Sequence, residues 1–186
     1  MKKNIQQKGY TLVELLAATA IIVIVSGLII GVLYSTLRGG NKTRIINEVA
    51  QNGNYALSVI SNTALLASSV TKVGGVDVTD CSTPKSGTSI EFKNADGSLV
   101  SFSCDITTSS IASSSANTTT YLIDNSSVKI DPATCDFTCK QTNNNPYANP
   151  IISASFTVSQ RNASSPFENA ASSTFNTSVT IRNYNP

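Results

Sequence analysis

The 186-residue sequence contains no histidine and no tryptophan. Without histidine the chain cannot form a Ser-His-Asp or Cys-His catalytic system, and it offers no imidazole to a metal ion. It also lacks a nucleophile elbow and a paired-acid motif, which argues against a membrane-tethered hydrolase. We therefore expect no enzymatic activity and no cofactor.

Charged residues are scarce as well. They make up 13% of the chain, against about 25% in typical soluble domains, and Ser, Thr and Asn replace them, mostly after residue 60. The net charge of +2 is too small to indicate a nucleic-acid partner, and no basic cluster with interleaved aromatic residues follows residue 50. Removing Lys2, Lys3 and Lys8 from the 13 basic residues leaves 10 against 11 acids, a net charge of −1.

A long apolar run follows these lysines. From Leu12 to Leu37 the ionisable groups are Glu14 and the phenol of Tyr34. As a helix the run is roughly 39 Å long, enough to cross a hydrocarbon core of about 30 Å. A buried core helix would show polar residues every three or four positions, but Ser26 is the polar residue between Ala20 and Ile30. We expect residues 10–38 to span a membrane.

The residues before the run indicate processing. A secretory signal is cleaved after its apolar segment, whereas this segment is too long and leads into a second, amphipathic helix. Cleavage is therefore expected in front of it, where Lys8 and Gly9 precede Tyr10. Gly9 supplies a small, flexible residue at the membrane surface.

The stretch KGYTLVELL closely resembles the prepilin signal of type IV pilins and of type II secretion pseudopilins. The resemblance implies that prepilin peptidase cuts between Gly9 and Tyr10 and methylates the new amine of Tyr10, a position where the family usually has Phe. It further implies a cytoplasmic leader over residues 1–9 and a single-pass anchor with its N-terminus inside. The partners it implies are other pilin subunits, the peptidase, the cytoplasmic membrane and the pilus assembly platform.

Glu14 is the fifth residue counted from Tyr10. An acid in hydrocarbon costs about 2.5–3.5 kcal/mol on insertion scales, so we expect a cationic partner. The resemblance implies that this partner is the Tyr10 amine of a neighbouring subunit during assembly. A contact with the amine of the same chain and a side chain reaching the near headgroups are the alternatives.

Residues 39–70 predict a second helix that continues the first. Apolar or small residues recur at gaps of three and four, which makes one apolar stripe suited to packing on a sheet. Gly39, Gly40 and Gly53 weaken this helix by about 1 kcal/mol each and are predicted flexible points. The stripe comprises Ile45, Val49, Ala56, Val59 or Ile60, Thr63, Leu66 and Val70.

From residue 71 the pattern changes to a period of two, which predicts an antiparallel β-rich head over residues 71–186. We expect a hairpin whose turn is Asn94–Gly97, and loops at 108–120 and 140–150. The fold class is thus α+β, with a long N-terminal helix packed on an antiparallel sheet. The other predicted strands are Tyr121–Ile123, Ser127–Ile130, Ile151–Val158 and Ser178–Arg182.

Four cysteines follow the apolar run, at positions 81, 104, 135 and 139. Their even number favours disulfides in an oxidising compartment outside the cytoplasmic membrane. Three pairings are possible; we expect Cys135 with Cys139, closing a small loop, and Cys81 with Cys104. A thiolate metal site would need closer pairs, so we expect no metal. Calcium at Asp77 and Asp80, or at Asp131 and Asp136, is disfavoured because no loop alternates oxygen ligands.

Two functions remain open. The first is a structural subunit of a type IV pilus or pseudopilus, assembled through its N-terminal helix into a periplasmic or extracellular filament. The second is a membrane-anchored minor pilin whose head is a tip adhesin or binding module. The helix-then-strands layout resembles larger minor pilins and favours a minor subunit, and the same signal serves pilus, competence and secretion systems.

Overall fold

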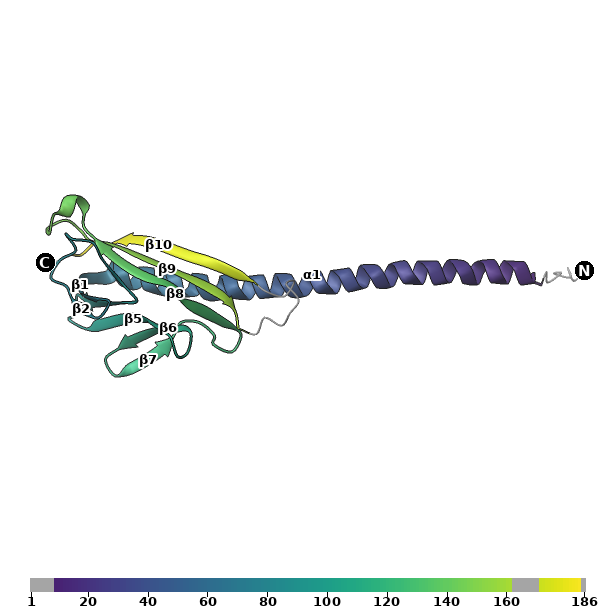
Figure 1. The fold of residues 1–186 in the computed structure, drawn as a ribbon, viewed down its shortest axis with the longest axis horizontal. Helices are drawn as coiled ribbons and strands as arrows, with labels where there is room; N and C mark the ends of the chain where they lie inside the picture. Colours follow the sequence, from purple (N-terminus) through teal and green to yellow (C-terminus); the bar gives the residue numbers. More distant parts are fainter. Residues whose placement is uncertain (1–8, 162–170, 185–186) are drawn as a thin grey trace, which may run out of the picture. The chain divides into compact units, whose positions relative to one another are not determined.

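The computed structural model describes residues 9–161 and 171–184. The leader lysines predicted to precede the cleavage site therefore lie outside the described residues. The chain divides into two compact units, residues 1–41 and 42–186, and helix α1 (Leu12–Leu66) begins in the first and ends in the second (Figure 1). In the first unit the described residues from Leu12 onward are helical and their side chains are exposed.

The second unit contains the last part of α1 and two antiparallel sheets (Figure 1). One sheet has the strand order β2-β1-β4-β5-β6-β7, and the other has the order β10-β9-β8-β3. This arrangement confirms the predicted α+β class. The strands are β1 (Ala67–Val73), β2 (Val76–Asp77), β3 (Lys85–Gly87), β4 (Ser89–Asn94), β5 (Leu99–Asp105), β6 (Ser110–Ser115), β7 (Thr118–Tyr121), β8 (Val128–Lys140), β9 (Ile151–Gln160) and β10 (Ser172–Thr180), with a 3₁₀ turn at Thr142–Asn144.

One hydrophobic core joins the helix to both sheets. The helix buries Val49, Gly53, Ala56, Ile60 and Ala64, whose spacing of three and four residues makes a single face. Much of the predicted stripe is thus correct, although Leu66 is exposed. From the sheets come four fully buried rings, Phe92, Phe102, Phe137 and Phe156.

Gly53 is a packing position and not the flexible point that we predicted. It is buried on the inner face of α1, and a Cβ placed there would overlap the ring of Phe175 on β10. That ring stacks on Phe156 of β9 with centroids 6.0 Å apart. The glycine lets the helix lie against the sheet at a distance that any side chain would increase.

The helix ends earlier than predicted. We expected it to reach residue 70, but Ala67–Val73 form β1, which pairs with β4. Two irregularities in that pairing, between Ala67 and Ser69 and between Val70 and Lys72, interrupt the normal alternation of the strand. Buried residues therefore recur every third position, and this spacing imitates a helix.

The predicted hairpin is present as β4 and β5, with Gly97 at φ 85° in the turn. The predicted loop at 108–120 is wrong, because it contains β6 and most of β7. Its Ser- and Thr-rich composition is typical of loops, yet β6 pairs along its whole length with β5 and buries Ile111 and Ala112. Non-local hydrogen bonding decided the conformation.

The disulfide pairing also differs from the prediction. Cys81 is bonded to Cys139 and Cys104 to Cys135, with Cα atoms 5.6 Å and 6.3 Å apart. Cys135 and Cys139 both lie on β8, where four residues of extended chain span about 13 Å, beyond the reach of a disulfide. The first bond joins the segment before β3 to β8, and the second joins β5 to β8, linking the two sheets.

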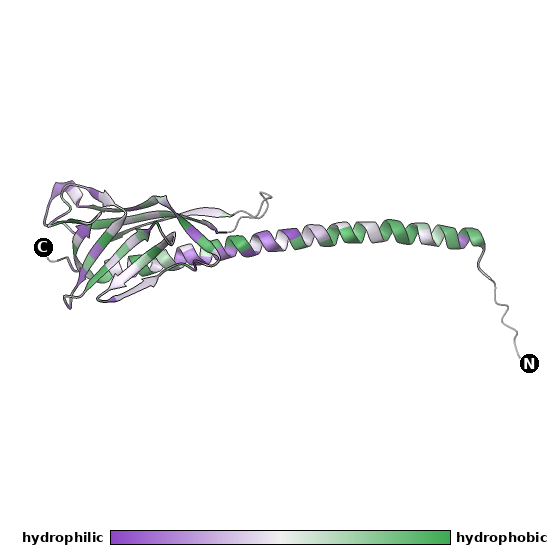
Figure 2. Ribbon diagram, turned by 60° about the horizontal axis from the view of Figure 1, so that its bottom comes forward, coloured by the Kyte–Doolittle hydropathy of each residue, from purple (hydrophilic) through white to green (hydrophobic). Residues whose placement is uncertain are grey.

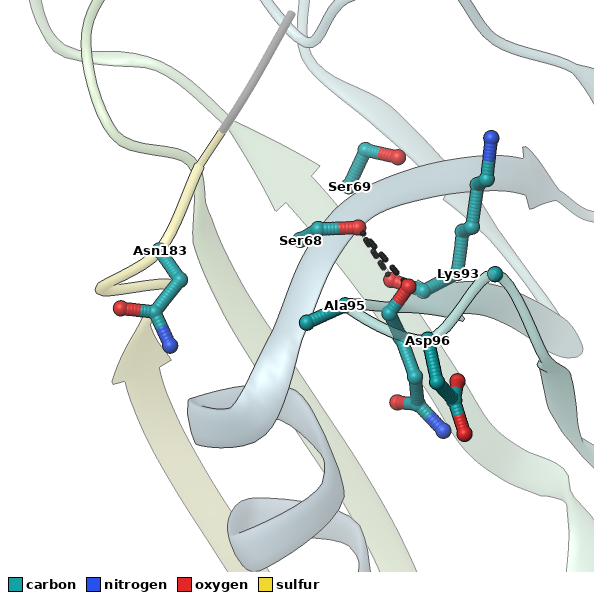
Figure 3. Close-up of a pocket in the computed structure, with 8 residues that line it drawn as sticks. Ser68, Ser69, Lys93, Ala95, Asp96 and Asn183 are labelled. Atoms are coloured by element: carbon teal, nitrogen blue, oxygen red, sulfur yellow. Dashed lines mark hydrogen bonds between the residues drawn. The ribbon is translucent and has the colours of Figure 1, made fainter.

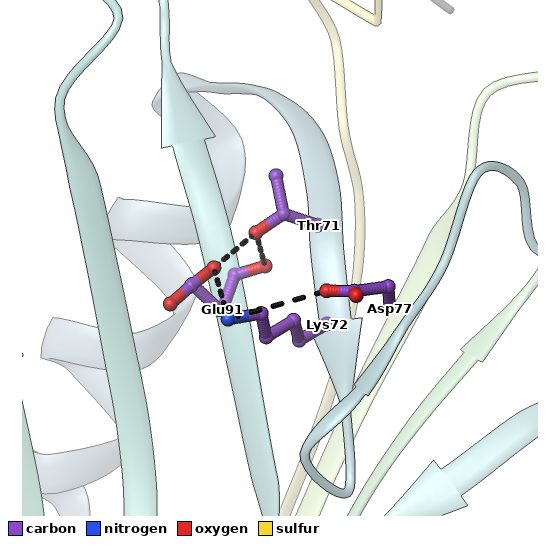
Figure 4. A network of polar contacts seen from close by, with 4 residues as sticks. All are labelled: Thr71, Lys72, Asp77 and Glu91. Carbon is purple, nitrogen blue, oxygen red and sulfur yellow. Dashed lines mark hydrogen bonds and ion pairs between the residues drawn. The ribbon is translucent and has the colours of Figure 1, made fainter.

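A small polar network covers one edge of the larger sheet (Figure 4). Lys72 Nζ on β1 lies 4.0 Å from Asp77 Oδ1 on β2 and 3.9 Å from Glu91 Oε1 on β4. The Thr71 hydroxyl donates to the same Glu91 oxygen at 2.7 Å. Exposed ion pairs contribute little stability, but charges on a short edge strand oppose pairing with another sheet.

Candidate functional site

The predicted cleavage residues lie just before the helix. Gly9 and Tyr10 have no regular secondary structure, and the Tyr10 side chain is 89% exposed. Helix α1 begins at Leu12, so the bond between Gly9 and Tyr10 is not protected by helical hydrogen bonds. The bond is therefore exposed and lies outside regular secondary structure.

Glu14 closes the first turn of the helix. The backbone N–H and the hydroxyl of Thr11 donate to Glu14 Oε2 at 2.9 Å and 3.0 Å. In return the Glu14 N–H donates to the Thr11 hydroxyl at 3.3 Å. This reciprocal arrangement is a capping box, in which a Thr at the N-cap and a Glu three residues later satisfy the free N–H groups of the helix start.

Our sequence interpretation missed Thr11, although the T-x-x-E pattern that defines a capping box is present in the chain. Three hydrogen bonds join Thr11 and Glu14, and both bonds that Glu14 accepts go to Oε2. Within the described part of the chain, Oε1 makes no hydrogen bond. The side chain can therefore cap its own helix and still present an oxygen to a cation from outside.

Between Leu15 and Leu37 helix α1 contains no charged residue, and its apolar side chains lie on all sides. All of these residues are exposed within the chain. Figure 2 shows this part of α1 as almost continuously hydrophobic. By length and composition the helix is suited to cross a membrane, and a soluble core helix would instead have been covered by its own sheets.

Two of the four acids considered for calcium, Asp80 and Asp131, accept hydrogen bonds from residues two positions later in the chain. The carboxylate of Asp80 accepts from the N–H and the hydroxyl of Ser82, and Asp131 accepts from the Ala133 N–H. The hydrogen bonds from Ser82 lower the pKa of Asp80. No group of three or more His, Cys, Asp or Glu side chains that could hold a metal is found in residues 9–161 and 171–184.

Three other aspartates in the described ranges make the same pair of hydrogen bonds as Asp80. Asp96, Asp105 and Asp124 each accept from the N–H and the hydroxyl of the Ser or Thr two residues later. The bonds from Thr107 lower the pKa of Asp105 to about 2, and those from Ser98 and Ser126 lower the pKa of Asp96 and Asp124. These acids shape turns by hydrogen bonding to nearby backbone.

A polar recess of about 500 Å³ lies where β1 meets the β4–β5 turn (Figure 3). The Ser68 hydroxyl donates to the carbonyls of Lys93 and Asn94 at 2.8 Å and 3.3 Å. Lys93 and Asp96 are its charged residues. Polar side chains from Ser68, Ser69, Asn94 and Asn183 complete the lining, and no aromatic residue belongs to it.

The comparisons with known proteins address the N-terminus. Residues 5–30 match the family model described as the prokaryotic N-terminal methylation motif. The match covers the Gly9–Tyr10 bond, Glu14 and most of the apolar run. Comparison with curated proteins and with solved structures finds no match.

Proposed function

We propose that this chain, whose N-terminus carries a prepilin-like signal of the type IV pilin and pseudopilin kind, is a structural subunit of a type IV pilus or pseudopilus. Prepilin peptidase removes residues 1–9 and methylates the Tyr10 amine, and the mature chain assembles through α1. The observation that carries the proposal is the methylation motif over residues 5–30, which coincides with an exposed apolar helix beginning two residues after Tyr10.

The apolar helix then has two successive surroundings. Before assembly it crosses the cytoplasmic membrane with the N-terminus inside, and afterwards it packs among the helices of other subunits. Both surroundings explain why large side chains such as Ile22 and Leu28 are more than 60% exposed in the single chain. The head, with two disulfides, belongs on the oxidising side.

Glu14 favours the assembled subunit over the single one. Its capping bonds with Thr11 reduce the cost of placing a carboxyl group in the membrane but supply no positive charge. The methylated amine of Tyr10 on a neighbouring subunit supplies that charge when the neighbour docks. An unassembled subunit thus holds an uncompensated acid, and the filament compensates it.

The test is the intact mass of the protein from cells with and without the peptidase. With the peptidase, the chain should lose residues 1–9 and gain one methyl group. Mature filaments that retain Met1 would refute the proposal. Glu14→Gln should insert into the membrane normally and reach sheared filaments in much smaller amounts; Glu14→Asp, which keeps the charge, is the matched control.

The alternative, a minor pilin whose head binds a target at the filament tip, has one feature in its favour, the recess beside Lys93 and Asp96. Copy number separates the two roles. A structural subunit occurs along the whole sheared filament, whereas a tip subunit occurs at a few copies per filament. Quantitative mass spectrometry of sheared filaments measures this ratio directly.

A further inference from the structure

A second hollow, of about 570 Å³, lies between the last part of α1 and the segment that follows β7. Two side chains, Tyr55 and Tyr121, are 58% and 48% exposed there. Asn52 on α1 joins the two walls, because its Oδ1 accepts from the Asp124 N–H at 2.8 Å. Its Nδ2 donates to the backbone carbonyl of Glu48, one turn earlier on the same helix, at 2.9 Å. The lining residues are Glu48, Gln51, Asn52, Tyr55, Tyr121, Leu122, Ile123 and Asp124.

The hollow is acidic. Glu48 and Asp124 line it, and the Tyr121 hydroxyl lies 3.5 Å from Asp105 Oδ2, which brings a third carboxylate to its rim. No Lys or Arg is among the lining residues. No ion pair is made by Glu48 with any cation in the described ranges, although Arg44 lies one turn before it on the same helix.

The chain itself carries the complementary charge. Residues 38–44 contain three basic residues and no acid, whereas residues 45–186 contain seven Lys and Arg against ten Asp and Glu. Within the second unit Lys42 and Arg44 are exposed on α1, and Glu48 follows on the same helix. Four to six residues of helix separate these cations from Glu48, which is about 6–9 Å along the axis.

We propose that this hollow receives the cationic helix segment Lys42–Arg44 of a second copy of the chain. A parallel copy displaced by about 6–9 Å along its helix axis sets these cations against Glu48. A guanidinium suits the surface because it binds carboxylates through two N–H groups and stacks on aromatic rings. Exposed tyrosines at a hollow are typical of protein interfaces.

The proposal rests on the proposed function, because filament growth is what places parallel copies side by side. Cross-linking in filaments tests it. The four native cysteines are all in disulfides, so an added cysteine supplies a reactive thiol. Two differently tagged copies are expressed together in the native cells, one with Thr43→Cys and the other with Gln51→Cys. Both substitutions leave every charge in place.

Positions 43 and 51 are about 12 Å apart along the helix, so a short bis-maleimide replaces direct oxidation. Treated filaments should give a dimer that contains one copy of each variant and is linked between residues 43 and 51. Contact raises the local thiol concentration, so we expect at least about tenfold more dimer than with a control pair. The control combines Thr43→Cys with Lys140→Cys, an exposed position at the far end of β8, about 40 Å along the strand from Val128.

Charge reversal adds a second measurement. Glu48→Lys should lower the dimer yield about tenfold, because two like charges then face each other. Asp136→Lys, which changes the net charge equally at an exposed residue of β8, should leave the yield unchanged. Equal losses in both variants would show that net charge matters and the hollow does not, which overturns the proposal.

The remaining outcomes separate the two proposals. Filaments with processed Tyr10 but no mixed dimer above the control would overturn the docking of the cationic segment and leave the subunit function intact. Cross-linking of Gln51→Cys to a different protein would overturn the choice of a second copy. Absence of filaments together with an unprocessed N-terminus would overturn both.

Discussion

Replacing Gly53 with alanine tests whether the packing of α1 on the head is as close as the structure shows. Helix propensity favours the change by about 1 kcal/mol. The added Cβ, however, overlaps the ring of Phe175, which is stacked on Phe156 and largely buried. Overpacking of this kind costs about 1–3 kcal/mol, so the expected net effect is a loss of up to about 2 kcal/mol.

A double-mutant cycle isolates the contact. Phe175→Ala should cost about 3 kcal/mol or more because it leaves a cavity beside Phe156. In that background Gly53→Ala has no ring to displace, so only the propensity gain of about 1 kcal/mol remains. The coupling between the two positions should therefore be about 1–3 kcal/mol.

The assay is urea unfolding of the full-length protein, followed by circular dichroism. With a slope of about 1–3 kcal/mol per M, a coupling of this size moves the midpoint by about 1 M. Asn54→Ala, at an exposed position on the same helix, measures what propensity contributes on its own. If Gly53→Ala stabilised the protein as much as Asn54→Ala does, the close approach of helix and sheet would be refuted.

Three further predictions concern the disulfides, the turn acids and the cap. Replacing both Cys81 and Cys139 with serine should destabilise the head by about 4 kcal/mol, because the bond closes a loop of 58 residues; peptide mapping without reduction should recover this pair, and a Cys135–Cys139 peptide would contradict the structure. The folded pKa of Asp105 is about 2, below its ordinary value of 3.8, so its contribution to stability is complete above about pH 5 and is lost as the pH falls through 3.8 and then through about 2. Asp105→Asn should flatten this part of the stability profile, and an unchanged profile would contradict the assignment. Thr11→Ala should weaken the first turn of α1 by about 1 kcal/mol, which faster amide exchange at Glu14 would report, whereas Thr11→Ser should exchange like the wild type.

Most of the functional N-terminus follows from local chemistry. One short stretch contains the apolar run together with Gly9, Tyr10 and Glu14, so the sequence alone predicts how they are arranged. Even the Thr11–Glu14 cap, which our sequence interpretation overlooked, is a contact between residues three apart. The cationic partner that we propose for Glu14 is different, because it belongs to another molecule.

The head behaves differently because long-range contacts decide it. The hairpin at Asn94–Gly97 was predictable from its turn residues and alternating strands. Ser110–Ser115 was not, because its strand conformation comes from pairing with β5 and not from its own residues. Likewise Ala67–Val73 has apolar residues at every third position, as a helix would. The strand buries them because its pairing with β4 has two irregularities.

The order of residues was therefore sufficient to establish an apolar anchor with a processing signal in front of it and an α+β head behind it. The tertiary structure decided which cysteines are bonded, where α1 ends, and why a glycine stands at position 53. The physical reason is distance along the chain. Hydrophobic runs and caps act within a few residues, whereas Cys81 and Cys139, or Gly53 and Phe175, meet only after the sheets have assembled around the helix.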